Sequence, residues 1–459
     1  MFETPKALSL VQALKSARET RRVEIGCALL ERAPDLFREQ FGERPAIIVA
    51  DGNTFAVVGQ TVWEAFRSAG HRCFDSFIFR DPALYAEYSY MMELEAALGQ
   101  DNAIPIAVGS GTINDLVKLA AHRLHRPYLS VATAASMDGY TAFGASITFN
   151  NSKQTFSCPA PAAVLADLNT ICAAPSAMNA AGYADLIAKK TAGADWLLAD
   201  ALGLEPIDPL AWDIVQGGLS SALANPAGVR YGEVTAIGQL TEGLMLSGLA
   251  MQCAKSSRPA SGAEHQFSHL WDMQHHTHRG RAPSHGFKVG IGALAVTALY
   301  EWLLEQPLDQ LDVEHCCALW AKNAGWEPRI SQLFSNPELA KVAWQETCAK
   351  SCSPEELRGQ LECLRVAWPS LRDRLRGQLL PFGELKQRLQ SVGAPAEPEQ
   401  IGISRAVLRE SYWRAFFIRR RFTVLDLAVR AGLLDDALQQ IFGSDPNTDG
   451  TRYFELIAP

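Results

Sequence analysis

The sequence lacks several features that would place it in a particular class of protein. Its first residues show neither the basic start nor the apolar run of a signal peptide. The longest apolar stretch, residues 289–304, is short for a membrane span and contains Glu301. Acidic residues outnumber basic ones, and the formal net charge of -8 argues against nucleic-acid binding. We therefore expect a cytoplasmic protein with no membrane span and no nucleic-acid partner.

Cysteine is also sparse, with ten residues in a chain of 459. Without a signal peptide, this number indicates reduced thiols rather than a disulfide framework. Cys348, Cys352 and Cys363 lack a fourth ligand of the usual kind, so buried free thiols explain them better than zinc does. No internal repeat or low-complexity tract is present. The length suggests two or three domains, and the content of 48% hydrophobic residues is typical of a globular chain.

The first third of the chain alternates short β-branched runs with helical periodicity. Such alternation predicts a parallel sheet covered by helices. After residue 175 the pattern is helical, so we expect an α/β domain over residues 1–175 and an all-α domain over residues 176–459. The expected strands are residues 46–50, 104–108, 128–132 and 163–167, with a hairpin of 145–149 and 154–158. The expected helices include 60–69, 112–124, 176–201, 234–255 and 288–306.

A glycine turn separates the strand expected at 104–108 from the helix that follows it. Glycine lets the backbone approach a phosphate, and a new helix offers free N–H groups and the positive end of its dipole. The dinucleotide fingerprint is incomplete, because Asn114 stands where the third glycine would be. A phosphate site and an ordinary turn are both compatible with this pattern. The residues concerned are Gly109, Ser110, Gly111, Thr112 and Ile113.

A second polar loop follows the strand expected at 128–132. Open parallel sheets bind ligands beside the carboxyl ends of their strands. Small hydroxyl residues followed by an acid could contact a cofactor and then a polyol, although an ordinary loop would look the same. The loop contains Thr133, Ala134, Ala135, Ser136 and, two residues later, Asp138.

Histidines are concentrated in one segment, where six of the ten lie between His265 and His285. His265 and His269 are four residues apart, so both imidazoles share a face if the segment is helical. Two histidines and one carboxylate leave a position open on a divalent ion, as in catalytic metal sites. Asp185 is the candidate carboxylate, because an acid in a small, apolar helical segment needs a partner if buried.

The alternative for these histidines is a solvated or core position without a metal. We interpret His275, His276 and His278 in this way, as residues of an exposed loop.

Several motifs together resemble the sn-glycerol-1-phosphate dehydrogenases, and especially their bacterial branch. This family belongs to the superfamily of iron-type alcohol dehydrogenases, glycerol dehydrogenases and dehydroquinate synthases. The resemblance extends from about residue 46 to residue 434, and the combination is more specific than any single motif. The matching runs are 136–141, 188–189, 195–196, 258–265 and 421–426.

The resemblance implies a dehydroquinate synthase-like fold, with a Rossmann-like NAD(P)-binding domain followed by a metal-binding helical domain. It also implies reduction of dihydroxyacetone phosphate to sn-glycerol 1-phosphate by a homodimer. The metal would be zinc or nickel, and the cofactor NAD or NADP. An acid can bind a ribose 2′-hydroxyl and repel a 2′-phosphate, so Asp51 slightly favours NAD over NADP.

Carried over position by position, the resemblance implies roles for individual residues. Asp185, His265 and His285 would bind the metal, and His269 would reach the substrate. Asp138 would contact substrate, and Lys288 and Arg258 are candidates for its phosphate, with solvated surface positions as the alternative. The cofactor would contact Asp51, Gly109, Ser110, Gly111, Thr112, Ile113, Thr133, Ala134, Ala135 and Ser136.

Two positions depart from the family pattern. Ala142 replaces a serine that contacts the cofactor, which predicts the loss of one hydrogen bond. Phe287 replaces a glutamate two residues after the last metal histidine, which puts the orientation of the metal ligands in question. Neither departure removes a ligand.

Three other functions stay open. A glycerol dehydrogenase would act on an unphosphorylated polyol, but residues 138–140 argue against it. A dehydroquinate-synthase-like lyase would carry glutamate at the position of Asp185 and a different motif before His265. A non-catalytic nucleotide-binding paralogue would be expected to have lost a metal ligand. The basic run at residues 419–421 is better explained by a salt-bridged helix face or a subunit contact than by nucleic acid.

Overall fold

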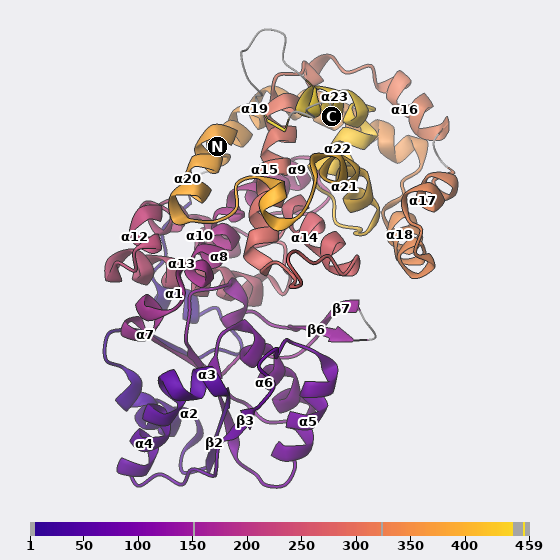
Figure 1. Ribbon diagram of the computed structural model, residues 1–459. Helices are drawn as coiled ribbons and strands as arrows, with labels where there is room; N and C mark the ends of the chain where they lie inside the picture. The colour runs from indigo at the N-terminus through magenta and orange to yellow at the C-terminus, as the bar shows by residue number, and fades with distance from the viewer. Residues whose placement is uncertain (1–4, 150–151, 323–324, 444–452, 455–459) are drawn as a thin grey trace. The chain divides into compact units, whose positions relative to one another are not determined.

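The computed structural model describes residues 5–149, 152–322, 325–443 and 453–454. Packing divides the chain into two compact units (Figure 1). The first comprises residues 1–187, 209–260 and 391–394, and the second residues 188–208, 261–390 and 395–459. The predicted division at residue 175 follows the change in secondary structure, whereas these units follow packing, so the predicted boundary stays a prediction.

The first unit is built on a six-stranded sheet in which every neighbouring pair is parallel. The order is β1-β8-β5-β4-β2-β3, and a separate hairpin pairs β6 with β7. The parallel sheet plus hairpin that the sequence predicts is thereby confirmed. The strands are β1 (Arg22–Gly26), β2 (Ala46–Asp51), β3 (Phe77–Phe79), β4 (Ile104–Gly109), β5 (Leu129–Ala132), β6 (Ala145–Phe149), β7 (Ser152–Phe156) and β8 (Ala163–Asp167).

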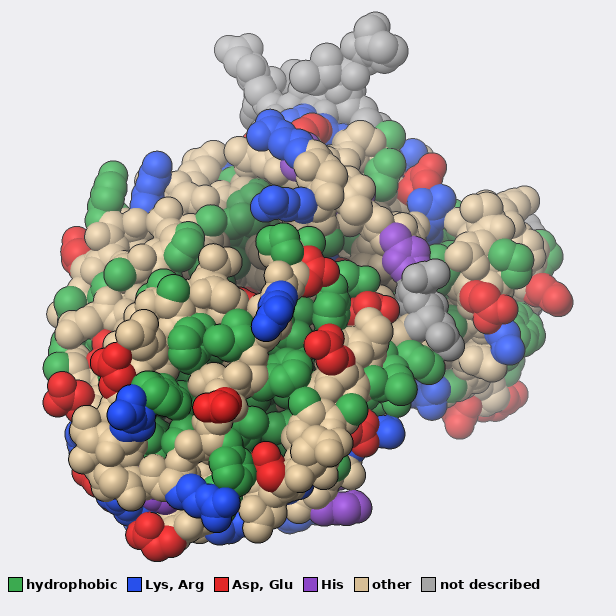
Figure 2. All heavy atoms as spheres, turned by 60° about the horizontal axis from the view of Figure 1, so that its bottom comes forward, with side chains coloured by type: hydrophobic (Ala, Val, Ile, Leu, Met, Phe, Trp, Pro, Cys, Tyr) green, Lys and Arg blue, Asp and Glu red, His purple; other side chains and the backbone are tan. Residues whose placement is uncertain are grey.

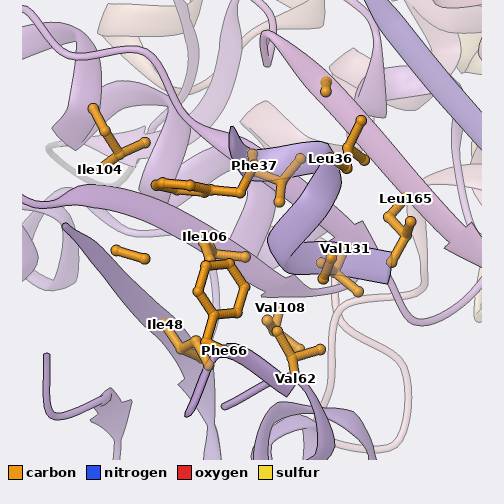
Figure 3. Close-up of a cluster of buried hydrophobic side chains, with 14 of the residues drawn as sticks. Leu36, Phe37, Ile48, Val62, Phe66, Ile104, Ile106, Val108, Val131 and Leu165 are labelled. Carbon is orange, nitrogen blue, oxygen red and sulfur yellow. The ribbon is translucent and has the colours of Figure 1, made fainter. Parts of the chain in front are cut away.

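Helices cover both faces of this sheet, because the strands alternate buried side chains between two cores. Ile48, Ile106 and Val108 pack on Phe37 of α2 and Phe66 of α4 (Figure 3). On the other face, apolar residues of the same strands pack against α5 and α6. In Figure 1 the two pairs of helices flank the strands on opposite sides. The helices are α2 (Ala33–Phe41), α4 (Gln60–Ser68), α5 (Tyr88–Leu98) and α6 (Gly111–Arg123).

The remaining helices of the first unit lie before, between or after the strands. A small cluster of apolar residues packs α1, α10 and α13 against one another. The elements are α1 (Leu10–Leu14), η1 (Leu30–Arg32), α3 (Gly52–Thr54), η2 (Phe55–Gly59), η3 (Asp138–Tyr140), α7 (Leu168–Ala173), α8 (Ser176–Ile187), α10 (Pro209–Gln216), α11 (Leu219–Ala222), α12 (Pro226–Arg230) and α13 (Val234–Ala254).

The second unit is helical, and the described residues after β8 contain no strand, as the sequence predicts. The helix expected over 176–201 is instead two helices that meet at Ala188. The elements are α9 (Lys189–Ala201), α14 (Ala263–Met273), α15 (His285–Leu304), η4 (Leu308–Gln310), α16 (Val313–Lys322), α17 (Glu327–Leu333), α18 (Pro337–Lys350), α19 (Pro354–Gln378), α20 (Phe382–Val392), η5 (Pro398–Ile401), α21 (Arg405–Phe417), α22 (Val424–Arg430) and α23 (Leu434–Phe442).

Helix α15 is the central helix of the second unit. Tyr412 of α21 donates a hydrogen bond to the carbonyl of Ala295 at 2.7 Å. Among the described residues, α15 is the one helix that is long and apolar enough to cross a membrane, but 83% of its apolar window is buried within the protein. Such burial is what a core helix of a globular protein requires, so length and composition alone do not indicate a span.

Candidate functional site

The strand order creates a switch point between β2 and β4. From β2 the chain proceeds to β3 at one side, whereas from β4 it proceeds to β5 at the other. Ligands of open parallel sheets bind outside the carboxyl ends of strands at such a point. Asp51 ends β2 and Gly109 ends β4, so residues that the sequence assigned to the cofactor flank the switch point.

The glycine turn after β4 is tightly packed against the start of α6. A Cβ on Gly109 would lie 2.6 Å from the Cβ of Ile113, so a larger residue cannot occupy this position without a shift. Ser110 precedes α6 in an extended conformation, and its side chain does not cap the helix. The N–H groups at the start of this 13-residue helix are thus not occupied by that hydroxyl, and they can face an anion.

Asp51 has a structural role that the sequence did not reveal. Its Oδ1 atom accepts hydrogen bonds from the N–H groups of Asn53 and Thr54, both at 2.8 Å, and thereby caps α3. The predicted contact with the adenosine ribose would use the second carboxylate oxygen, and it stays a prediction.

The loop after β5 lies beside the glycine turn. The N–H of Thr133 donates to the carbonyl of Gly109 at 3.2 Å. Thr133, Ala134 and Ala135 are buried, and the loop is fixed by Tyr140, whose hydroxyl donates to the carbonyl of Ala134 at 2.7 Å. Burial raises the pKa of Tyr140 far above its ordinary value, so this hydroxyl stays a proton donor.

One face of α8 contacts this loop through three residues at a spacing of three. The Oδ1 atom of Asn179 accepts the N–H of Ala135 at 3.0 Å. A Cβ on Gly182 would lie only 1.9 Å from the carbonyl oxygen of Ala135. One turn further, the Oδ2 atom of Asp185 accepts the N–H of Asp138 at 3.1 Å. Residues three apart lie on the same side of a helix, which explains how one helix contacts the loop at both Ala135 and Asp138.

Sequence reasoning identified Asp185 but missed its two partners on α8. A polar, a small and an acidic residue at a spacing of three within an apolar helix is the signal that could have found them. Asp185 is fully buried, and Asp138 also accepts a hydrogen bond from the hydroxyl of Ser247 at 2.9 Å. The candidate substrate residue and the candidate metal ligand are therefore held in one hydrogen-bonded group.

In the second unit, three of the predicted imidazoles form a cluster. The ring centroids of His265 and His285 are 5.3 Å apart. His269 lies 6.3 Å from the ring of His265 and 6.4 Å from that of His285. Helix α14 carries the first two residues and α15 begins with the third, so packing of these two helices creates the cluster.

Glu264 orients His265, although the sequence analysis had assigned it no role. Its Oε1 atom lies 2.8 Å from the Nδ1 of His265, and its Oε2 accepts the hydroxyl of Thr191 at 2.9 Å. Burial raises the pKa of this carboxyl, but hydrogen bonds from His265 and the N–H of Gly262 outweigh burial and leave the pKa below its ordinary value. A carboxylate on Nδ1 directs Nε2 towards a metal.

Asp195 anchors the start of α14. Its Oδ2 accepts the N–H of Ala263 at 2.7 Å, while its Oδ1 accepts the hydroxyl of Tyr300 at 2.6 Å and the N–H of Val424 at 2.8 Å. In addition, Arg421 donates to the carbonyl of Ser261 at 2.6 Å. The two distant motifs at 195–196 and 421–426 thus support the helix that carries His265.

The two candidates for binding the substrate phosphate are buried, so the alternative of a solvated surface position is wrong for both. Lys288 is buried and forms an ion pair with Asp272. Arg258 is also buried. The Oγ atom of Ser268 lies 3.4 Å from the Nδ1 of His285, so this imidazole has a polar neighbour although Phe287 replaces the glutamate of the family pattern. The roles of Lys288 and Arg258 in phosphate binding stay predictions.

Other predicted features can be located as well. The carbonyl of Ala142 accepts a hydrogen bond from Lys118 at 2.8 Å.

His276 is partly buried, and its Nε2 lies 2.7 Å from the carbonyl of Ile401, so the prediction of a solvated loop residue is wrong for this histidine. All ten cysteines are free. Arg420 pairs with Glu346 at 2.6 Å, so the basic run is salt-bridged as predicted, but it lies between α21 and α22 and not on a helix face. Figure 2 shows one face of the protein, on which acidic and basic side chains are interspersed.

Comparison with known proteins identifies the family. Residues 24–175 match the model of the family described as iron-containing alcohol dehydrogenase. The glycerol-1-phosphate dehydrogenase [NAD(P)+] of Halalkalibacterium halodurans is 34% identical over 285 residues, covering 62% of this chain and 71% of that protein. That of Geobacillus thermodenitrificans is 29% identical and covers 83% of this chain and 86% of its own.

Among solved structures, glycerol dehydrogenase from Schizosaccharomyces pombe matches with a TM-score of 0.60 at 14% identity, covering 96% of this chain and 93% of that chain. At this identity the likeness shows the fold alone, which is that of the superfamily predicted from the sequence. The sequence relatives go further, because they extend over most of both chains. The chain therefore belongs to the glycerol-1-phosphate dehydrogenase family.

Proposed function

We propose that this protein reduces dihydroxyacetone phosphate to sn-glycerol 1-phosphate, using NADH or NADPH and a bound divalent metal. The observation that carries the proposal is the 34% identity over 71% of a protein named glycerol-1-phosphate dehydrogenase [NAD(P)+]. In the reaction, hydride from the cofactor and one proton convert the ketone of the substrate into a secondary alcohol. The oxidised cofactor is the second product.

The cofactor would bind at the carboxyl edge of the sheet. The start of α6 would hold its pyrophosphate through the N–H groups of Gly111, Thr112 and Ile113, as helix N-termini bind anions. The loop from Thr133 to Ser136 would lie along the nicotinamide. Asp51 would contact the adenosine ribose through the carboxylate oxygen that does not cap α3.

Asp185, His265 and His285 would hold the metal. One carboxylate and two imidazoles are a donor set that could hold a metal ion, and it suits zinc or nickel. Glu264 would support this site without binding the metal. Its carboxylate lies on the Nδ1 of His265 and so fixes the tautomer in which Nε2 is the ligand. When bound, the ion would polarise the substrate ketone and lower the barrier to hydride transfer.

The protein side chains would position the substrate and move the proton. His269 lies beside both candidate histidine ligands and would supply a proton through a substrate hydroxyl. The Asp138 carboxylate, held by Ser247, would accept a hydrogen bond from the substrate. Lys288 would contribute positive charge for the phosphate, and it would share that charge with Asp272.

The test is oxidation of NADH by dihydroxyacetone phosphate, compared with dihydroxyacetone, before and after chelation and after return of zinc or nickel. We expect metal-dependent turnover of the phosphate ester only. Turnover of dihydroxyacetone instead would assign the protein to the glycerol dehydrogenases. No turnover of either by an enzyme that binds both NADH and metal would overturn the proposal in favour of a lyase or a non-catalytic paralogue.

We also propose that the enzyme is a cytoplasmic homodimer, as the family resemblance implies. Sedimentation of the purified chain would show a mass twice that of the monomer, and a monomer that retains full turnover would contradict this part of the proposal.

A further inference from the structure

A cavity of about 530 Å³ lies in the first unit, at the amino ends of the strands. Its walls include Arg21, Tyr128 and Ala162, which directly precede β1, β5 and β8. Backbone hydrogen bonds join these three residues: the N–H of Arg21 donates to Ala162 at 2.8 Å, and that of Ala162 donates to Tyr128 at 3.0 Å. Because the proposed cofactor residues occupy the opposite, carboxyl edge of the same sheet, this cavity is a different place.

The lining of the cavity is basic, although the whole chain is acidic. Four cationic side chains line it against one carboxylate, that of Glu19. The chain as a whole has a formal charge of -8. A concave basic surface on an acidic protein concentrates anions locally.

Two of these cations serve the fold. Lys118 is buried, and its ammonium donates to the carbonyls of Gly139, Ala142 and Gly144 at 2.8 to 3.0 Å. Arg126 is held by carbonyls at the end of α5 and in the loop that follows. Each also lies within 4 Å of a carboxylate, Lys118 of Asp115 and Arg126 of Asp101, so the positive charge that is left for a ligand comes from Arg18 and Arg21.

The other donors are exposed and available. Arg18, Arg21, His122 and His125 all line the cavity and are exposed to solvent. One nitrogen of Arg21 donates to the carbonyl of Gln40 at 3.3 Å. In the described part of the chain, no side-chain partner is seen for the other three. His125 has a left-handed backbone with φ of 55° and directly follows the C-cap of α6, where this conformation commonly ends a helix.

We propose that this cavity binds a phosphorylated small molecule, whose phosphate is held by Arg18, Arg21, His122 and His125. A guanidinium group presents paired N–H donors that match phosphate oxygens, and imidazole adds further donors. The volume exceeds that of a phosphate and falls in the range of small-molecule sites. Tyr128 and the prolines and alanines of the wall would contact the organic part of the ligand.

The experiment is calorimetric titration of glucose 6-phosphate into the enzyme loaded with metal and NADH, with glucose as the uncharged control. The test variant is Arg18→Ser with Arg21→Ser. The matched control is Arg44→Ser with Arg80→Ser, which removes the same charge from exposed positions outside the cavity. We expect the wild type and the control to bind the ester equally, and the test variant to bind at least tenfold more weakly.

A second variant guards against misfolding caused by loss of Arg21. His122→Ala alters an exposed side chain in the last turn of α6 and should weaken binding about threefold with no change in circular dichroism. Equal binding by the test variant and the wild type, equal weakening in the control, or binding of glucose would each overturn the proposal. Binding is read by heat and not by turnover, so failure of the proposed reaction would leave this result interpretable.

Discussion

Replacing Gly182 by alanine tests whether α8 positions the loop that follows β5. The new Cβ would lie 1.9 Å from the carbonyl oxygen of Ala135, where ordinary contact requires more than 3 Å, and neither partner is a flexible side chain. Overpacking of this kind costs about 1 to 3 kcal/mol. Separation of the helix from the loop would also weaken the hydrogen bonds that Asn179 and Asp185 accept from the N–H groups of Ala135 and Asp138. Loss of each hydrogen bond lowers the free energy of unfolding by about 1 kcal/mol. Alanine returns about 1 kcal/mol through helix propensity. The expected net destabilisation is therefore about 2 to 4 kcal/mol.

The assay compares Gly182→Ala with Gly238→Ala, which makes the same change in helix α13. There the new Cβ meets only a leucine methyl at 3.4 Å, so Gly238→Ala should be neutral or slightly stabilising. Urea denaturation followed by circular dichroism measures stability, and NADH fluorescence measures cofactor binding. We expect Gly182→Ala to lower the urea midpoint and to weaken NADH binding at least tenfold. If the two variants were equally stable and bound NADH equally well, the inferred contact between α8 and the loop would be wrong.

Three further predictions concern the second unit. Glu264→Gln should weaken zinc binding about 10- to 100-fold in a competition titration, because His265 loses the carboxylate on its Nδ1; unchanged affinity would refute this orienting role. Asp195→Ala should destabilise the fold by about 3 to 5 kcal/mol, since three buried donors lose their acceptor, and a normal melting temperature would contradict it. A hydrogen bond from Arg420 lowers the pKa of Glu346 below 4.5. The stabilisation is therefore complete above about pH 4.5 and is lost as the pH falls through the folded pKa. Accordingly, Arg420→Gln should lower the melting temperature at pH 7 but have much less effect at pH 3; an equal effect at both would exclude the ion pair as the cause.

Most strands were predictable because their signal is local. The strands at 46–51, 104–109, 129–132 and 163–167 are mostly apolar and buried on both faces, and this pattern is visible in sequence. β1 was missed because its five residues lie at the edge of the sheet and lack the nearly continuous apolar run by which the other strands were recognised. β3 was missed because it has only three residues. The hairpin was predicted, although its second strand is Ser152–Phe156 rather than 154–158; residues 150 and 151 of its turn lie outside the described residues.

The residues of the candidate site could likewise be predicted only where their signal is local. The glycine turn, Asp185 and the three clustered histidines could be identified from residue type and spacing, because metal and phosphate binding require particular donors. Their supporting residues could not. Glu264 is adjacent to His265 in sequence, but its carboxylate could have pointed elsewhere, and only the packed helix places it on Nδ1.

The local elements, the chemistry available at their ends and the family of the chain can be recognised from the amino-acid sequence alone. These follow from hydrophobic periodicity and short motifs, which depend on neighbouring residues. The tertiary structure decided the strand order, in which β1 pairs with β8, and the joining of Asp195 to Ala263, Tyr300 and Val424. It also decided that the face of α8 with Gly182 lies on the loop after β5. Such pairings join residues far apart in the chain, and they are selected by the packing of the whole unit rather than by any local preference.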